Sequence, residues 1–198
     1  MTGLREINAT DPLLLFDDWL RRAAASEPND PNAAALATAT ANGQPSVRMV
    51  LMKRVGERRF CFFTNAESQK GQELAENPRA ALCFHWKSLR RQVRVEGSVS
   101  ELEAREVDTY FHSRSRASQI GAAISNQSRV LASREELARR VEQFAQDNPR
   151  EILRPAFWRG FEVRAERIEF WIDGPHRLHD RFLFTRTGGE WQKVRLFP

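Results

Sequence analysis

The chain has too few cysteines for a secreted protein held together by disulfides. It also has no apolar run long enough for a membrane-spanning protein. Its 198 residues include two cysteines, Cys61 and Cys83, each inside an apolar run and without metal-ligand spacing. We therefore expect both to be buried and reduced. No apolar run approaches the roughly 20 residues of a membrane-spanning helix, and the N-terminus lacks a basic segment followed by an apolar one. These absences predict a cytoplasmic protein without a membrane partner.

Lysine is scarce as well, and histidine has no partner at metal-ligand spacing. Arginine supplies nearly all of the 31 basic residues, and the net charge of +5 is moderate. With no long block of one sign, nucleic-acid binding is not indicated. Arginine suits phosphate and carboxylate ligands, although a bias in genomic base composition would enrich it equally. We predict no metal site, and without a glycine-rich phosphate loop any phosphate must be bound by side chains.

Turn and capping signals divide the first half of the chain. Asp11 followed by Pro12 predicts the start of an amphipathic helix that ends near Ser26 and leads into a linker. Asn42-Gly43 is a strong hairpin signal. Ser68 caps a short helix that ends at Glu76. The strands expected in this half cover 33–40, 46–54, 59–64, 80–86 and 92–102.

The second half begins with helices and returns to strands. A helix is expected from Glu103, a break at 113–116, a short helix near 119–124 and, from the capping box at Ser133, a longer one. The strands expected after it cover 161–163, 167–171, 177–184 and 191–196. The order predicts a mainly β, α+β fold, an antiparallel barrel or sandwich with peripheral helices. We expect one domain, 1–198, with an N-terminal helix and linker (1–31), a helical insertion (103–150) and C-terminal strands (160–198).

Several charged residues follow the Asp173-Gly174-Pro175 turn near the end of the chain. If the segment after the turn is a strand, alternation places Arg177, His179 and Arg181 on one face. Two guanidiniums beside an imidazole suit an anion or an aromatic ring that carries a phosphate. A solvated edge strand would carry the same residues, so the pattern leaves both interpretations open.

This terminal run, Glu169-Phe170-Trp171 followed by Arg177-Leu178-His179-Asp180-Arg181, resembles the signature of the pyridoxine (pyridoxamine) 5′-phosphate oxidases. Three further stretches resemble the same family in the same order, namely 48–53, 63–71 and 110–119, and the match runs from about residue 11 to the end. The resemblance implies a Greek-key, FMN-binding split β-barrel. It also implies a homodimer with two FMN sites at the subunit interface.

The resemblance also assigns roles. FMN phosphate would be bound by Arg48 and Lys70, at a site that includes Gln69, Gln127 and Ser128. The flavin would be lined by Met49, Val50, Leu51, Met52, Lys53, Phe63, Thr64 and Gln92, and completed from the other subunit by Trp171 and Arg181. The substrate phosphate would be bound by Lys53, Tyr110, Arg114 and Ser118. The catalytic residues would be Arg177 and His179, which also bind the substrate ring.

Spacing tests two of these assignments. Tyr110, Arg114 and Ser118 are four residues apart and would share one face of a continuous helix, although Tyr110 as a core residue and Arg114 as a solvated one would fit the same pattern. Arg48 and Lys53 are five apart, which places them on opposite faces of a regular strand. Either a bulge or a bend intervenes, or one of the two assignments is wrong.

The chain departs from the family pattern at named positions. Gln69 stands where arginine is usual, which removes a charge from the phosphate site, and Ile172 replaces a glutamine beside the flavin. We also expect the N-terminal arm that can close over the site in some relatives to be short or missing.

The resemblance implies FMN-dependent oxidation of pyridoxamine or pyridoxine 5′-phosphate to pyridoxal 5′-phosphate, with O2 as acceptor and H2O2 as product. The alternatives are a flavin oxidase of the phenazine-biosynthesis type and a non-catalytic protein that binds FMN or pyridoxal phosphate. Lys53, Tyr110 and Arg114 favour a phosphorylated substrate, whereas Gln69 leans toward the phenazine branch.

Overall fold

One antiparallel sheet organises the chain, and the computed structural model describes residues 7–198 of it. The path through the sheet is β2-β1-β5-β6-β7-β4-β3, and β8 pairs with both β7 and β9. The strands are β1 (Ala33–Ala39), β2 (Pro45–Leu51), β3 (Lys53–Val55), β4 (Arg58–Asn65), β5 (Arg79–Trp86), β6 (Arg91–Glu101), β7 (Trp158–Ile172), β8 (Asp180–Thr187) and β9 (Glu190–Leu196). The predicted mainly β fold with peripheral helices is therefore confirmed.

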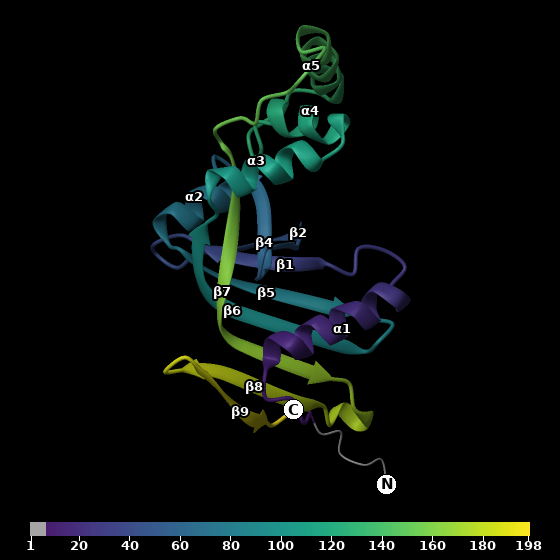
Figure 1. The fold of residues 1–198 in the computed structure, drawn as a ribbon, viewed down its shortest axis with the longest axis vertical. Helices are drawn as coiled ribbons and strands as arrows, with labels where there is room; N and C mark the ends of the chain where they lie inside the picture. The colour runs from purple at the N-terminus through teal and green to yellow at the C-terminus, as the bar shows by residue number, and fades with distance from the viewer. Residues whose placement is uncertain (1–6) are drawn as a thin grey trace.

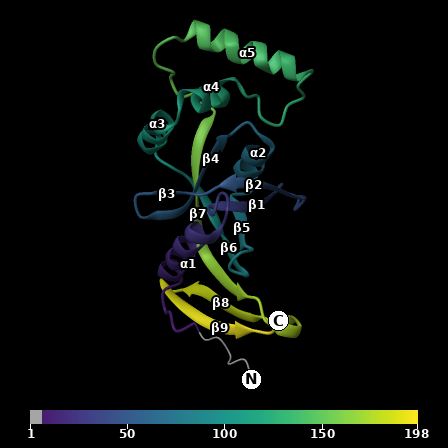
Figure 2. The ribbon, with the colours of Figure 1, turned by 90° about the vertical axis from the view of Figure 1, so that its right-hand side faces the viewer.

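The helices lie around this curled sheet. They are α1 (Pro12–Ser26), α2 (Gln69–Glu76), α3 (Ala104–Ser113), α4 (Arg116–Ile124) and α5 (Arg134–Asp147), with a short 3-10 turn, η1 (Pro175–Arg177). Figure 1 shows β7 crossing the middle of the molecule, with α3, α4 and α5 beyond one end and β8 and β9 at the other. Figure 2 shows α5 lying across that helical end. Within 7–198 no helix has both the length and the apolar character needed to cross a membrane.

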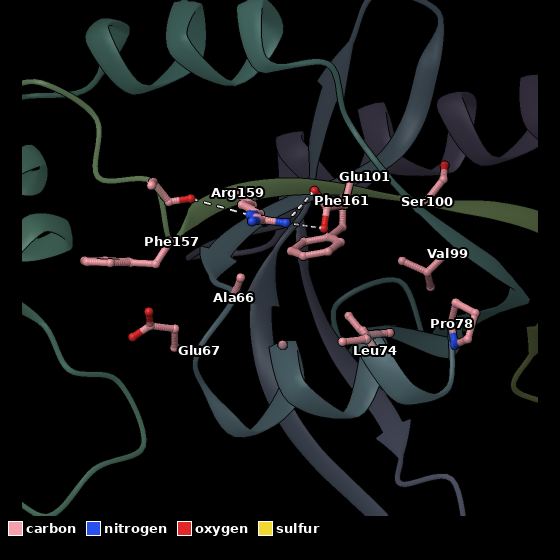
Figure 3. A pocket seen from close by; sticks show the side chains of 13 residues that line it. Ala66, Glu67, Leu74, Pro78, Val99, Ser100, Glu101, Phe157, Arg159 and Phe161 are labelled. Carbon is pink, nitrogen blue, oxygen red and sulfur yellow. Dashed lines mark hydrogen bonds and ion pairs between the residues drawn. The ribbon is translucent and has the colours of Figure 1, made fainter.

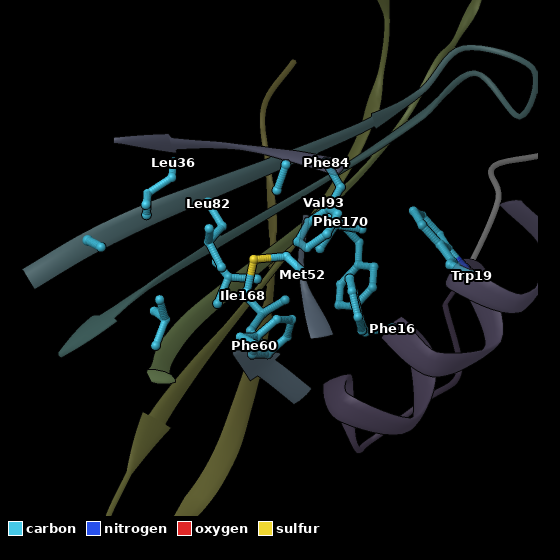
Figure 4. Close-up of a cluster of buried hydrophobic side chains, with 14 of the residues drawn as sticks. Phe16, Trp19, Leu36, Met52, Phe60, Leu82, Phe84, Val93, Ile168 and Phe170 are labelled. Carbon is cyan, nitrogen blue, oxygen red and sulfur yellow. The ribbon is translucent and has the colours of Figure 1, made fainter. Parts of the chain in front are cut away.

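Aromatic side chains from α1 and the sheet form the main core. Asp11 accepts the backbone N–H of Leu13 at 2.7 Å and so fixes the start of α1. The buried Phe16 ring then packs edge-on against Phe60 and Phe84, with centroids 4.8 and 5.0 Å away. Figure 4 shows these rings with Met52 among them. Burial of each such side chain contributes about 2–3 kcal/mol, which holds α1 against the sheet.

The strand predicted over 46–54 is wrong at Met52, where the chain breaks into β2 and β3. Asn32 holds the break, since its carbonyl accepts the Met52 N–H at 2.9 Å and its amide donates to the Met52 carbonyl at 2.8 Å. The Met52 side chain is 5% exposed and enters the core. A bend, rather than a regular strand, therefore separates Arg48 from Lys53.

The segment between β7 and β8 also differs from the prediction. The expected strand over 177–184 begins only at Asp180, because 175–177 form η1 and both His176 (φ 55°) and Arg177 (φ 63°) are left-handed. Gly174 permits this tight loop, since a Cβ there would lie 2.0 Å from the Leu178 carbonyl oxygen. Arg177, His179 and Arg181 therefore do not share one strand face.

The strands predicted over 161–163 and 167–171 are parts of the single strand β7. The register against β6 shifts between Glu96 and Gly97, where the partners change from Arg167 to Ala165 and Glu166 is the extra residue. The Glu166 carboxylate accepts the Ser98 N–H at 3.1 Å. The bulge bends the strand without ending it.

Candidate functional site

A pocket of about 770 Å³ lies between the β2–β3 edge, β4, the start of α2 and the α3–α4 junction. Its volume is in the range of small-molecule sites. The predicted site residues that line it are Arg48, Met49, Val50, Leu51, Lys53, Phe63, Thr64, Gln69, Lys70, Tyr110, Arg114, Ser118, Gln127 and Ser128. Segments far apart in the sequence thus meet in one cavity.

Lys70 is the buried cation of the pocket, with 7% of its surface exposed. Its ammonium donates to Gln127 Oε1 at 2.7 Å, to Thr64 Oγ1 at 3.1 Å and to Ser68 Oγ at 3.2 Å. All three acceptors are neutral. Burial, together with the charge of Arg48, lowers the Lys70 pKa to about 8. A buried ammonium that contacts no carboxylate within the described residues favours an anion as ligand.

Arg48 and Glu73 form an ion pair beside Lys70. Arg48 Nη2 lies 3.3 Å from Glu73 Oε2, and the Glu73 side chain is 4% exposed. Burial raises the Glu73 pKa, but hydrogen bonds from Ser46, Thr38 and Gln69 and the charge of Arg48 outweigh it and bring the pKa to about 2. The carboxylate therefore stays ionised and holds the arginine.

Replacing Glu73 should weaken the fold chiefly above pH 4.5. Since its folded pKa lies below the unfolded value, the carboxylate stabilises the protein fully above about pH 4.5 and progressively less as the pH falls toward 2. We expect Glu73→Gln to lower the free energy of unfolding at pH 7 by about 1–3 kcal/mol, allowing for solvent screening, and to flatten its pH dependence between 4.5 and 2. Urea unfolding across this range measures both effects. The exposed Glu76→Gln on the same helix is the matched control, and an equal loss in both variants would contradict the assignment.

Stacked rings form the opposite wall. Phe63 lies against Tyr110 with centroids 4.0 Å apart and against Trp158 at 5.2 Å. The Arg114 guanidinium lies 5.0 Å from the Trp158 centroid. Its Nη1 is buried and has no hydrogen-bond partner within 7–198, and burial lowers the Arg114 pKa. Arg114 also lines the pocket and makes no ion pair within 7–198, so its guanidinium suits an anionic ligand there.

The α3–α4 junction brings Tyr110, Arg114 and Ser118 into the pocket without a continuous helix. The predicted break is confirmed, because α3 ends at Ser113 and Ser115 caps α4 by accepting the Ser118 N–H at 3.3 Å. The Ser115 and Ser118 hydroxyls lie 2.9 Å apart. The chain turns at Arg114, and all three predicted side chains still line one wall.

Six predicted residues do not line this pocket: Met52, whose side chain is buried in the core, and Gln92, Trp171, Arg177, His179 and Arg181. Gln92 pairs with Trp171 across β6 and β7, and Trp171 pairs with Arg181 across β7 and β8. The His179 ring packs 4.6 Å from Trp171, and its Nδ1 accepts the Gly174 N–H at 3.2 Å, with Asp173 Oδ1 also 3.2 Å away. The sequence-predicted site thus falls into two separate groups within one chain.

A second pocket, of about 510 Å³, lies between α2 and the sheet (Figure 3). Its one guanidinium, Arg159, makes bonds of 2.8 and 3.0 Å to the two oxygens of Glu101. That charge is therefore neutralised, and much of the remaining lining is apolar, including Leu74, Val99 and Phe161. At the first pocket, by contrast, Lys53, Lys70 and Arg114 make no ion pair within 7–198.

Sequence reasoning missed four polar or aromatic residues of the first pocket. Ser46, Ser115 and Trp158 line it, and Glu73 lies beneath Arg48. Ser46 lies two residues from Arg48 on one strand face, and Glu73 lies four residues from Gln69 on one helix face, so spacing could have indicated both. Nothing local marks Trp158, because β7 brings it in from the far end of the chain.

Two family models match the chain and cover most of the residues described above. The pyridoxamine 5′-phosphate oxidase family model matches residues 20–147, well over half of the chain. The chain belongs to this family. A second model, the pyridoxine 5′-phosphate oxidase C-terminal dimerisation region, matches residues 158–198. The boundary falls just before β7, so the first pocket lies mainly in the oxidase region, and Trp171, Arg177, His179 and Arg181 lie in the dimerisation region.

Individual proteins and solved structures are also similar to this chain over nearly its whole length. The chain is 56% identical over 191 residues to a protein of Gluconobacter oxydans named pyridoxine/pyridoxamine 5′-phosphate oxidase, covering 95% of this chain and 94% of that one. A Rhodospirillum rubrum protein of the same name is 56% identical over 194 residues, covering 95% and 96%. Crystalline PhzG from Burkholderia lata, in complex with tetrahydrophenazine-1-carboxylic acid, has a TM-score of 0.91 at 29% identity, covering 100% and 98%. An FMN-binding protein from Nostoc punctiforme, at TM-score 0.79, 15% identity and coverage of 96% and 100%, shares the fold.

Proposed function

We propose that this protein is an FMN-dependent oxidase that converts pyridoxamine or pyridoxine 5′-phosphate to pyridoxal 5′-phosphate. O2 is the acceptor and is reduced to H2O2, and with the amine substrate water is taken up and ammonia is released. The observation that carries the proposal is the identity above 50% to pyridoxine/pyridoxamine 5′-phosphate oxidases over nearly the whole chain. The family requires a flavin. FMN as the particular flavin, and the cytoplasm as the location, are parts of the proposal.

The donor set of the first pocket fits a ligand with a phosphate at one end. Lys70 has only neutral acceptors, Arg48 lies beside it, and Gln127 and Ser128 close the same end. We assign these residues to the FMN phosphate. Gln69 donates from its Nε2 to Glu73 at 3.0 Å, so it supports the carboxylate instead of adding a charge.

The other end of the pocket fits the phosphate of the substrate. Arg114 has an unsatisfied nitrogen, and Lys53, Tyr110 and Ser118 lie on the same lining. The bend at Met52 allows Arg48 and Lys53 to serve two different phosphates. Binding the substrate phosphate far from the reacting carbon uses remote binding energy to orient the ring.

A homodimer would bring the two residue groups together. In the proposed assembly Trp171 and Arg181 of one chain complete the flavin site of the other, and Arg177 and His179 cover the substrate ring. The match of 158–198 to a dimerisation region supports this arrangement. Exposed apolar side chains on the edge strand β2, Val47 (68%) and Met49 (64%), provide a surface that a second copy would cover.

The protein residues would bind, orient and exclude water, and bound FMN would supply the two-electron redox chemistry and its coupling to O2. His179 Nδ1 lies 3.2 Å from both the Gly174 nitrogen and Asp173 Oδ1, which fix the orientation of the ring. Nε2, which makes no hydrogen bond within 7–198, is then left for the substrate. Arg177 would orient the substituent that reacts.

One anaerobic experiment tests the reaction class. The purified protein should show a flavin spectrum, and pyridoxamine 5′-phosphate added without oxygen should bleach it, because the substrate reduces the flavin. Aeration should restore the colour and release H2O2. A protein that neither takes up FMN nor is bleached by the substrate would refute the proposal.

The phenazine-type oxidase is the second candidate, because PhzG shares the fold at a TM-score of 0.91. Its sequence identity of 29% is much lower than the 56% to the Gluconobacter protein. Arg114, which lines the pocket and has no carboxylate partner within 7–198, also favours a phosphorylated substrate. Turnover of a reduced phenazine carboxylate, with none of pyridoxamine 5′-phosphate, would reverse the assignment.

A further inference from the structure

Glu169 is a buried carboxylate between two arginines of neighbouring strands. It lies on β7, is 7% exposed and pairs in register with Arg94 of β6. On its other side, Arg181 of β8 reaches it from two register positions away. Glu169 does not line the first pocket, whereas Arg181 is assigned to the flavin.

Each oxygen of Glu169 serves one arginine. Oε1 accepts from Arg181 Nε at 2.7 Å, and Oε2 accepts from Arg94 Nη1 at 3.3 Å. Arg94 has a second carboxylate, Glu96, at 2.7 Å. Within 7–198, Glu169 is the only carboxylate that pairs with Arg181. The hydrogen bond that Arg181 donates to Glu169 is the main cause that raises the Arg181 pKa.

A second contact fixes the orientation of the Arg181 guanidinium. Its Nη1 donates to the Phe197 carbonyl at 3.0 Å, while Nη2 makes no hydrogen bond to the described part of the chain. Two held nitrogens define the plane of the guanidinium, because the group is rigid. The direction of the remaining nitrogen, Nη2, is then fixed by these two contacts and not by the flexible arginine side chain. Arg181 lies beside Trp171 on the neighbouring strand.

We propose that Glu169 is the positioning residue of Arg181, which it holds with Nη2 free for the flavin of the partner subunit. This inference rests on the proposed function. The carboxylate does not itself contact the flavin. Its effect on flavin binding must therefore pass through Arg181, which distinguishes it from a residue that only supports the sheet.

Flavin affinity, measured by quenching of FMN fluorescence on apoprotein, tests the proposal. Glu169→Gln should weaken FMN binding about 10-fold, because the ion-paired bond to Arg181 is replaced by a weaker bond to a neutral amide oxygen. Glu169→Asp keeps the charge with a shorter reach and should fall between Glu169→Gln and the wild type. Glu96→Gln is the control, since Glu96 pairs with Arg94 and Arg167 but not with Arg181, and it should leave the affinity unchanged.

A double-mutant cycle separates positioning from general structural support. In an Arg181→Ala background, Glu169→Gln should cause little further loss of FMN affinity, because the residue through which it acts is gone. An equal loss in both backgrounds, or an unchanged affinity in the single variant, would overturn the proposal. If the wild type failed to bind FMN at all, the proposed function would fall and this inference with it.

Discussion

Arg177→Ala should lower kcat/KM for pyridoxamine 5′-phosphate by about 100- to 1,000-fold while FMN stays bound, because loss of one orienting or charge-stabilising donor has effects of this size. Arg177 lies in η1, outside the pocket that is assigned to FMN, and makes no ion pair within the described chain. Its removal should therefore change the reaction without changing flavin content. Steady-state kinetics and the flavin-to-protein ratio of the purified variant measure the two effects separately.

Two variants control for the backbone of that loop. His176→Ala changes an exposed neighbour with the same left-handed conformation (φ 55°) and should retain nearly full activity. Arg177→Lys keeps the charge but loses the planar fork and should recover only part of the rate. Full turnover of Arg177→Ala would refute the catalytic assignment, and an equal loss in His176→Ala would attribute the effect to loop conformation.

Local signals predicted the element boundaries where the chain stabilises itself over a few residues. The caps are examples: Asp11 binds the Leu13 N–H, and Ser133 accepts the Glu136 N–H at 3.1 Å. The Asn42-Gly43 hairpin formed as expected, with Gly43 at φ 87°. These contacts involve neighbours in sequence, so residue type and spacing contain the information.

The errors occurred where a distant residue decides the local conformation. Asn32, twenty residues earlier, breaks the strand at Met52. In the terminal segment the period-2 pattern predicted a strand through Arg177, but the close approach of Gly174 to Leu178 produces a turn. Alternation alone does not distinguish a strand from a tight loop with charged residues.

Only part of the site was predicted, because residues distant in the sequence also decide how the site is built. Motif resemblance found the residues that contact a ligand directly, and the fold places most of them in one cavity. It did not find Glu73, which acts by holding Arg48, or Trp158, which supports the Arg114 side chain. Supporting residues depend on tertiary packing, so a short sequence motif does not reveal them. The roles of the lining residues toward FMN and substrate stay predictions.

Lys70→Met should weaken FMN binding by about 10- to 100-fold and at the same time stabilise the apoprotein. The affinity is lost because a charge-assisted contact with a phosphate contributes about 1.5–3 kcal/mol. The stability is gained because the ammonium is buried without a carboxylate in contact, and methionine fills a similar volume without a charge. FMN titration and urea unfolding of the apoprotein measure the two opposite changes.

The pH dependence of the free energy of unfolding should distinguish the buried Lys70 from an exposed lysine. The folded Lys70 pKa is about 8, below the ordinary value of 10.5, so the unfolded chain binds more protons between these two pH values. The cost of burying the charge is therefore present in full below pH 8 and is relieved as the pH rises toward 10.5, so wild-type stability should gain a rising component of up to about 3 kcal/mol across this window. Lys70→Met should lack that component, and the exposed Lys87→Met should retain it.

FMN affinity of the wild type should fall above pH 8 as the Lys70 ammonium loses its proton. A pH-independent affinity together with a less stable Lys70→Met apoprotein would show that Lys70 supports the fold instead of binding the phosphate.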